Sequence, residues 1–377
     1  MNRLASWTLG FAVCSFVIFL HAQAHAKQFA LLTAPGFCNA IVVLDPTQFV
    51  VGTIAVPGPT QSIAISPDGK RAYVTHFEFN QSPGGLLVID LATEKVIAEV
   101  PMEPRGFNDL AITPDGKHAY VTNGKVVSVV DTSTNTVEAR VPMDVGFPSW
   151  IAITPNGKQA YVGNVDLAAP LGKEQLPISV IDTTLKKVVA TIPVAANAMA
   201  IAPDGKAYAT EIGAQDQNVA VIDTANNTVV ARVQAGVSPF AIAVTPDGKK
   251  VWVSNQGPTT RDPPNESTIS VIDTGTNQVV ATFPVQFQPS KVFFTPDGQF
   301  GLVTFFEGDF TPGGGGIVSV INTAALPPTI GFGTTTMGIG HAVGGIAFAE
   351  LRDRDANVMR DAQAERARLR VPGNRAK

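Results

Sequence analysis

Four oxygen-bearing side chains stand at matching places in this sequence, each directly after a short run that contains Tyr or Trp. Amide and carboxylate oxygens are the ligands that a hard cation such as Ca²⁺ prefers. If the four met at one point, they could hold a divalent cation that polarises an ester carbonyl and assists its hydrolysis. The alternative interpretation is structural, because Asn tolerates the backbone geometry of turns. The four residues are Asn123, Asn164, Glu211 and Asn255.

Sequence motifs for other chemistries are absent. The chain contains no Gly-x-Ser-x-Gly nucleophile motif, no His-Glu-x-x-His zinc motif and no Cys-x-x-Cys pair. We therefore expect a binding or interaction protein more than an enzyme. A metal-assisted hydrolase remains the alternative, with Ca²⁺ or another divalent cation as its cofactor.

A short turn motif sets the spacing of the chain. Pro-Asp-Gly or Pro-Asn-Gly recurs at intervals of 41 to 50 residues. Pro presets a φ of about −65° and Gly tolerates a positive φ, so the motif predicts a tight turn between two strands. The copies begin at Pro67, Pro114, Pro155, Pro203, Pro246 and Pro296.

A second motif, two apolar residues followed by Asp, also recurs once per repeat. Its carboxylate can accept hydrogen bonds from nearby backbone N–H groups, so we interpret this Asp as a turn former and not as a catalyst. The copies end at Asp45, Asp90, Asp131, Asp182, Asp223 and Asp273, with Asn322 as a seventh, degenerate copy.

Each repeat resolves into four short strands. In one repeat the pattern predicts strands at 150–154, 159–163, 178–182 and 187–192. A repeat of this length is typical of one β-propeller blade. Seven copies therefore predict an all-β, seven-bladed β-propeller with four antiparallel strands per blade.

The two ends of the chain complete the seventh blade. Residues 29–34, 40–45 and 50–56 match the second, third and fourth strands of a repeat, with no first strand before them. Residues 345–349 match a first strand with nothing after it. Pairing three N-terminal strands with one C-terminal strand would close the ring and leave only short edges.

The second strands carry the residues of a known repeat. The runs at 72–76, 119–123, 160–164 and 251–255 read Ala-Tyr-Val-Thr-His, Ala-Tyr-Val-Thr-Asn, Ala-Tyr-Val-Gly-Asn and Val-Trp-Val-Ser-Asn. From Phe29 to Glu350 the chain resembles the YVTN-type β-propeller repeat family. The resemblance implies a group that contains surface-layer proteins, periplasmic binding propellers and relatives of lactonases and haem-carrying propellers. In lactonase-like relatives a carboxylate and amides surround one metal, which is the hydrolase alternative; the fold alone does not choose.

Loop lengths vary on one face of the expected ring. In an antiparallel meander, the loops from second to third strands and from each fourth strand to the next first strand emerge at one end, which we call the loop-rich face. The distance from Pro-Asp-Gly to the following Asp motif varies from 17 to 27 residues, whereas the distance from that Asp to the next Pro-Asp-Gly varies from 21 to 24. Such one-sided variation usually marks recognition. We expect a ligand there, in a funnel lined by His76, Glu78, Arg105, Asn108, Asp109, Trp150, Asp166, Lys291, Glu307, Asp309 and His341.

The opposite end of the ring, which we call the turn face, should carry the Pro-Asp-Gly turns and the Asp-motif turns. His118 begins a second strand at that end, so we do not expect it to meet His76 and His341.

The first 26 residues match an export signal, with Met-Asn-Arg, an apolar run and Ala24-His25-Ala26 in succession. We expect cleavage near Ala26 and Lys27, a propeller over 27–350, and a periplasmic or secreted protein. No later segment has the roughly 20 apolar residues of a membrane span, so none is expected after signal removal.

Charge separates the ring from the C-terminal end. Residues 27–350 hold 27 acidic and 18 basic side chains, whereas the Arg- and Ala-rich tail at 351–377 holds 4 acidic and 8 basic ones. Nucleic-acid binding depends on cations that neutralise phosphates. We therefore do not expect a nucleic-acid partner, and single-strand DNA binding, described for some relatives, is the weakest alternative. The expected partner is a small molecule, peptide or protein on the loop-rich face.

Overall fold

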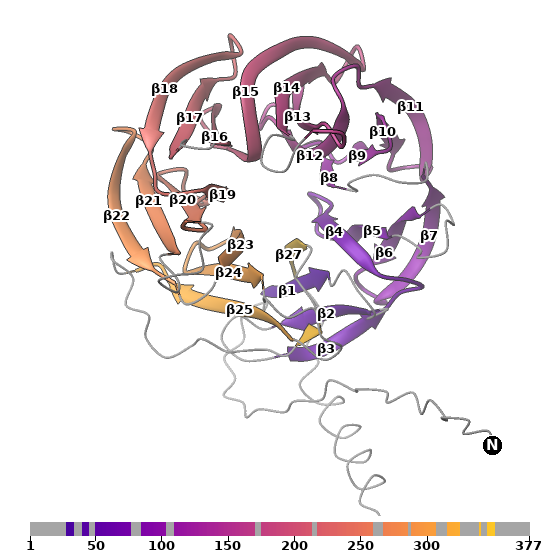
Figure 1. Cartoon of the computed structure of the whole chain (residues 1–377). Coiled ribbons are helices and arrows are strands. Elements are labelled where there is room, and N and C mark those ends of the chain that lie inside the picture. Colours follow the sequence, from indigo (N-terminus) through magenta and orange to yellow (C-terminus); the bar gives the residue numbers. More distant parts are fainter. Residues whose placement is uncertain are drawn as a thin grey trace, which may run out of the picture.

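A computed structural model describes the chain over residues 28–33, 40–44, 50–76, 84–102, 109–169, 175–212, 217–258, 267–285, 288–306, 315–324, 339–340 and 345–350. Within these ranges every regular element is a β-strand, and neighbouring strands pair antiparallel. Figure 1 shows the sheets standing around a common centre, each roughly radial. The prediction of an all-β, propeller-like arrangement of antiparallel sheets is confirmed.

The strands form five four-stranded sheets and one seven-stranded sheet. One sheet joins both ends of the described chain and contains, in order, β27 (Gly345–Glu350), β1 (Gln28–Thr33), β2 (Ala40–Leu44) and β3 (Val50–Ala55). The next contains β4 (Thr60–Ile65), β5 (Arg71–His76), β6 (Gly85–Asp90) and β7 (Lys95–Pro101). It is followed by β8 (Leu110–Ile112), β9 (His118–Asn123), β10 (Val126–Asp131) and β11 (Thr136–Pro142).

The seven-stranded sheet contains β12 (Phe147–Ile153), β13 (Gln159–Val165), β14 (Gln175–Asp182), β15 (Lys187–Ile201), β16 (Lys206–Glu211), β17 (Asn218–Asp223) and β18 (Thr228–Gln234). The two last sheets contain β19 (Pro239–Val244), β20 (Lys250–Asn255), β21 (Thr268–Asp273) and β22 (Gln278–Pro284), and then β23 (Gln288–Phe294), β24 (Phe300–Phe306), β25 (Gly315–Asn322) and β26 (Ile339–Gly340).

The long strand β15 differs from expectation. A fourth strand was expected to stop at residue 192, but β15 runs on to Ile201 and serves as the outer strand of one repeat and the inner strand of the next. The run Ala195-Ala196 joins them because its backbone still pairs on both sides, with Pro177 and with Glu211. The two repeats are therefore one continuous sheet.

Both turn motifs behave as the sequence predicts. The glycines of the six Pro-Asp/Asn-Gly turns have φ between 69° and 89°, a region that favours Gly. In the Asp motif the carboxylate accepts backbone N–H groups, as where Asp131 Oδ1 accepts from Ser133 at 2.7 Å and Thr134 at 3.1 Å. These hydrogen bonds, led by the Ser133 hydroxyl, hold the pKa of Asp131 below its usual range. The recurring Asp is thus a turn former.

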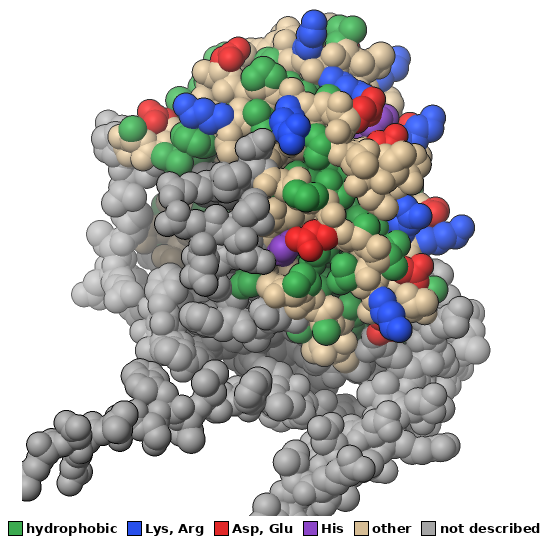
Figure 2. Space-filling model, turned by 90° about the vertical axis from the view of Figure 1, so that its right-hand side faces the viewer, with side chains coloured by type: hydrophobic (Ala, Val, Ile, Leu, Met, Phe, Trp, Pro, Cys, Tyr) green, Lys and Arg blue, Asp and Glu red, His purple; other side chains and the backbone are tan. Residues whose placement is uncertain are grey.

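The outer strands share one irregularity. Each of β7, β11, β15, β18 and β22 has a register shift opposite its third strand, and the residue at the shift points outward. Bulges of this kind twist an outer edge and hinder edge-to-edge pairing. Figure 2 views the side of the molecule that carries β7 and β11, where hydrophobic side chains lie among charged ones. Four of the five shift residues are exposed Ile97, Val189, Val230 and Val280, and the fifth is Glu138.

The core lies between repeats. Each cluster of buried side chains draws its members from two neighbouring repeats, as where Tyr73 and Leu86 pack against Val121 and Val130. Another cluster joins Ala30 and Leu32 of β1 to Leu302 of β24. Burial of apolar area at these contacts is the main stabilising term.

Tyrosines of the second strands reinforce the same contacts. Tyr120 donates from its hydroxyl to the carbonyl of Thr183 in the next repeat at 3.1 Å, and Tyr208 donates to Asn277 Oδ1 at 3.4 Å. Tyr161 donates to Thr224 and Asn227 in the same way. The recurrent Tyr therefore ties one repeat to the next.

Within the described ranges, no helix has the length and apolar character needed to cross a membrane. The expected signal at 1–26 and the tail at 351–377 lie outside the described residues.

Candidate functional site

The residues that end the second strands turn into their own sheets. His76 is 1% exposed, and its side chain crosses β6 over Gly85, where an added Cβ would lie 2.9 Å from Nε2. Beyond Gly85 the same nitrogen meets Glu99 Oε1 on the outer strand at 2.8 Å. His76 therefore points away from the centre of the ring, contrary to its expected place in the funnel.

The proposed metal ligands behave alike. Asn164 is buried and donates to the carbonyl of Pro177 at 2.8 Å and to Ser179 at 3.0 Å, both on its neighbouring strand. Asn255 is buried and donates to Thr268 and Ser270, each at 3.0 Å.

Glu211 takes part in an ion pair in which Arg232 Nε lies 3.0 Å from both carboxylate oxygens, and Asn123 is buried. Three of the four expected ligands thus have partners inside their own sheets, so the set does not converge on one cation. Among the described residues, no group of three or more His, Cys, Asp or Glu could hold a metal ion.

Trp150 is part of the core, not of the funnel wall. It is 9% exposed, packs with Tyr161 and Ile178, and donates from Nε1 to the carbonyl of Ala196 at 3.0 Å. Its ring lies over Gly163, where an added Cβ would be 2.0 Å away. The other repeats carry Thr or Ser at the position of Gly163, so the Gly makes room for the indole.

Asp109 lies where three sheets meet. Its Oδ1 accepts from the Ser62 hydroxyl of β4 at 2.8 Å, and its Oδ2 accepts from the backbone N–H of Ile151 in β12 at 3.1 Å. Its own N–H donates to Thr122 at 2.9 Å. The carboxylate is therefore fixed at the inner end of these sheets.

Lys291 lies on β23, in a repeat well separated from that of Asp109. The turn motifs align Lys291 with Asp109 at the same level of their repeats, five positions before the respective Pro. Burial lowers the pKa of Lys291 below its ordinary value, and the negative charge of Asp109 opposes that fall. Two expected funnel residues from well-separated repeats therefore interact electrostatically.

Of the remaining expected funnel residues, only Asp166 lies within the described ranges. Asp166 Oδ1 accepts the backbone N–H of Ala168 at 2.9 Å and so closes a local turn. The others lie outside the described residues: Glu78, Arg105, Asn108, Glu307, Asp309 and His341.

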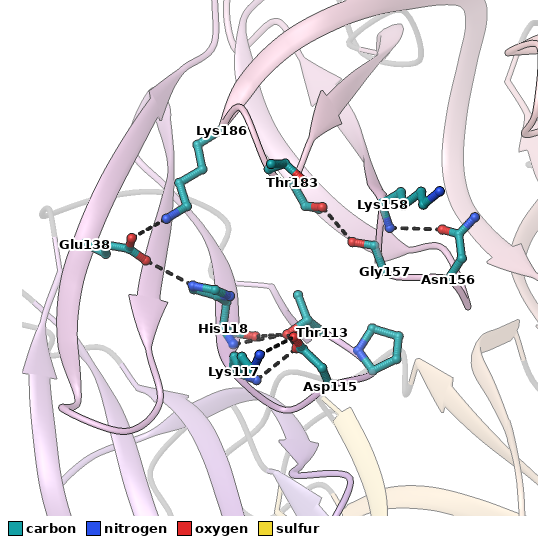
Figure 3. Close-up of a pocket in the computed structure, with 12 residues that line it drawn as sticks. Thr113, Asp115, Lys117, His118, Glu138, Asn156, Gly157, Lys158, Thr183 and Lys186 are labelled. Carbon is teal, nitrogen blue, oxygen red and sulfur yellow. Dashed lines mark hydrogen bonds and ion pairs between the residues drawn. The ribbon is translucent and has the colours of Figure 1, made fainter.

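A cavity of about 710 Å³ opens on the turn face, between the repeat of β8–β11 and the repeat that begins with β12. The turns at 113–118, 156–158 and 183–186 line it together with Glu138 of β11. Figure 3 shows Glu138, His118 and Lys117 on one side and Thr183, Gly157 and Lys158 on the other. Its size falls within the range of small-molecule sites.

Three polar side chains, His118, Glu138 and Lys186, meet at this cavity. His118 Nε2 lies 3.0 Å from Glu138 Oε2, and Lys186 pairs with the other carboxylate oxygen (Figure 3). Lys186 is the main cause that lowers the pKa of Glu138, and His118 adds to it. The carboxylate thus stays ionised and orients His118 and Lys186, which come from two neighbouring repeats.

Sequence reasoning missed this cluster, although a signal was present. At the position of Glu138 five other repeats have Ile or Val, and at the position of Lys186 three have Asn. His118 stands where other repeats have Arg71, Gln159, Lys206 and Lys250. The three departures from the repeat pattern converge in space.

No family model and no curated protein matches this chain. Among solved structures it is similar to Kuenenia stuttgartiensis hydrazine synthase, with a TM-score of 0.58 and 25% sequence identity over 71% of this chain and 78% of that chain.

Proposed function

We propose that the sheets form a closed seven-bladed β-propeller of the YVTN repeat type. Seven repeats of the Asp motif support the blade count. Pairing of β27 with β1 supports closure, because it joins the two ends of the chain in one sheet. The cluster of Ala30, Leu32 and Leu302 supports it further, because it packs that sheet against the last repeat.

On this scaffold the protein acts as an exported binding protein, with its ligand or partner at the centre of the loop-rich face. The observation that carries this proposal is the pair formed by Asp109 and Lys291. A half-buried lysine and a carboxylate fixed by Ser62 and Ile151 would give the centre of the loop-rich face one group of each sign. Polar groups converging on such a space are typical of ligand sites.

The ligand class that suits this pair is a small molecule or peptide end with an anionic group. A partly desolvated ammonium attracts a carboxylate more strongly than a solvated one does, because water screens it less. The hydrolase alternative has less support, since the side chains of Asn164, Glu211 and Asn255 are each held by partners within their own repeats.

A thermal-shift screen of the purified protein tests the proposal, using small carboxylic acids, amino acids and short peptides. We expect at least one class of compound to raise the melting temperature of the wild type, and the shift to disappear in Lys291→Met. The exposed Lys187 of β15 supplies the matched control, Lys187→Met, in which the shift should remain. No stabilising compound, or a shift that survives in Lys291→Met, would contradict the proposal.

A further inference from the structure

The sequence of the repeat formed by β8–β11 explains why a cavity opens on the turn face. In two other repeats the residue that begins the second strand reaches across to the next repeat: Arg71 donates to the carbonyl of Thr132 at 2.9 Å, and Lys206 donates to that of Thr274 at 3.1 Å. His118 occupies the same position but turns to Glu138 in its own sheet. The space beside the next turn is therefore left open.

The cluster beside this space departs from the repeat in three places at once. An exposed aliphatic side chain is replaced by Glu138, which is 43% exposed, and the left-handed turn position usually held by Asn is held by Lys186 with φ of 51°. A lysine gains nothing from that backbone conformation, since Asn adopts it more easily. The ion pair with Glu138 is an interaction that Asn could not make at this position.

The charge balance of the lining favours an anion. Lys117, Lys158 and Lys186 face only two carboxylates. Of those two, Asp115 is engaged in its own turn, where it accepts from the Thr113 hydroxyl at 2.7 Å, and Glu138 is held between His118 and Lys186. Lys117 Nζ lies 3.8 Å from Asp115 Oδ2, whereas the turn of Lys158 has Asn156 in place of that Asp. The lining therefore carries one more lysine than carboxylates, with Lys117 and Lys158 on the two sides of the opening (Figure 3).

We infer that this cavity binds a small polyanion, with carboxylate or phosphate groups reaching from Lys117 and His118 on one side to Lys158 on the other. Lysine ammonium groups bind such oxyanions as point charges with three donors each. The Glu138 pair sets the position of Lys186 and His118 at the edge of the same space. This site is on the opposite end of the ring from the proposed loop-rich site, and either can exist without the other.

Titration calorimetry with citrate and with inorganic phosphate tests the inference directly on the purified protein. We expect saturable binding with one site per chain, with affinity about tenfold weaker in the double variant Lys158→Met/Lys186→Asn. Lys186→Asn restores the residue of the other repeats, and Lys158 is exposed, so the melting temperature without ligand should change little. If citrate binds and phosphate does not, the natural ligand is a carboxylate; the reverse result assigns a phosphate.

Lys249→Met is the matched control, because Lys249 holds the same turn position as Lys158 in a repeat that lacks the cluster. Its side chain is 79% exposed. We expect unchanged affinity in this variant. The inference is overturned if neither anion binds saturably, or if Lys249→Met weakens binding as much as the double variant does, since that result means diffuse surface charge.

Discussion

The hydroxyl of Tyr120 donates to the carbonyl of Thr183 across the boundary between two repeats, at 3.1 Å. Burial raises the pKa of Tyr120 to about 12. An unfolded tyrosine ionises at about pH 10. The unfolded chain therefore releases this proton first as pH rises, and the contribution of the neutral phenol to folding is complete below pH 10 and lost toward pH 12.

Replacing the phenol tests this tie. Tyr120→Phe should lower the free energy of unfolding by about 1 kcal/mol at pH 7, through loss of one hydrogen bond. Between pH 10 and 12 the wild type should lose stability that the variant does not, so the gap between them narrows. Urea unfolding across this pH range measures the effect. Parallel pH curves for the two proteins would refute it.

Replacing Gly163 by the Thr that most other repeats have at this position should destabilise the protein. Gly163→Thr restores the residue of other repeats but puts a side chain where the Trp150 ring lies, with a Cβ contact of 2.0 Å. We expect a loss of at least about 1 to 3 kcal/mol in the free energy of unfolding. The double variant Trp150→Ala/Gly163→Thr should regain part of it, because Thr75, Thr122 and Thr210 accept a first-strand N–H at this position. Equal stability of the single variant and the wild type would mean that the indole moves freely.

Glu94 stands in a left-handed conformation with φ of 56°, where three other repeats have Asn. Glu94→Asn should raise the free energy of unfolding by about 0.5 to 1 kcal/mol, since Asn adopts this conformation with less strain. The reverse change, Asn135→Glu, should lower it by a similar amount. Chemical denaturation of both variants measures the pair, and changes of the same sign would argue against a backbone origin.

Leu32 tests whether the two ends of the chain are tied together as proposed. The side chain is fully buried with Leu302 and Val318. Leu32→Ala should cost about 2 to 5 kcal/mol of unfolding free energy. Leu185→Ala, at a side chain that is 62% exposed, should change it by less than about 0.5 kcal/mol. Similar small effects in both variants would mean that the closing contact contributes little.

The negative charge of Asp109 should raise the pKa of Lys291. This charge opposes the effect of burial, so Asp109→Asn is expected to lower the pKa of Lys291 further. NMR of the protein with ¹³C-methylated lysines, which keep their charge, follows this titration. A pKa that stays constant or rises in the variant would show that the two groups do not share one space.

Most of the fold could be read from the sequence because its turn motifs are local. Pro-Asp-Gly needs a positive φ at Gly, and the Asp motif needs acceptors beside free N–H groups, so both act without tertiary context. The strands at 159–163 and 29–34 followed from these turns, and the structure has Gln159–Val165 and Gln28–Thr33. The continuous strand β15 was not predictable, because Pro193 and Asn197 between its two halves are residues that favour a turn, and only pairing on both sides keeps the segment extended.

The direction of side chains was predictable but was missed for His76 and Asn164. Alternate residues of a strand share a face. His76 shares its face with Ala72 and Val74, which are buried between sheets, and Asn164 shares its face with Ala160 and Val162. Strand-end position alone suggested a ring of ligands, whereas this alternation assigns both side chains to the packed face.

The cluster of His118, Glu138 and Lys186 shows a different limit. Each residue departs from its repeat, which the sequence alone reveals. That they meet depends on how far one repeat lies from the next, since Lys186 reaches Glu138 from a neighbouring repeat. Only the packing between sheets fixes that distance.

The central claim is that a ligand binds beside Lys291, and the ¹³C-methyl signal of that lysine tests it most directly. The signal is assigned by its loss in Lys291→Met, and a compound that stabilises the protein is then added to saturation. The proposed function predicts that the Lys291 signal shifts while that of the exposed Lys187 does not. A saturated protein in which other lysines shift and Lys291 stays unchanged would contradict it.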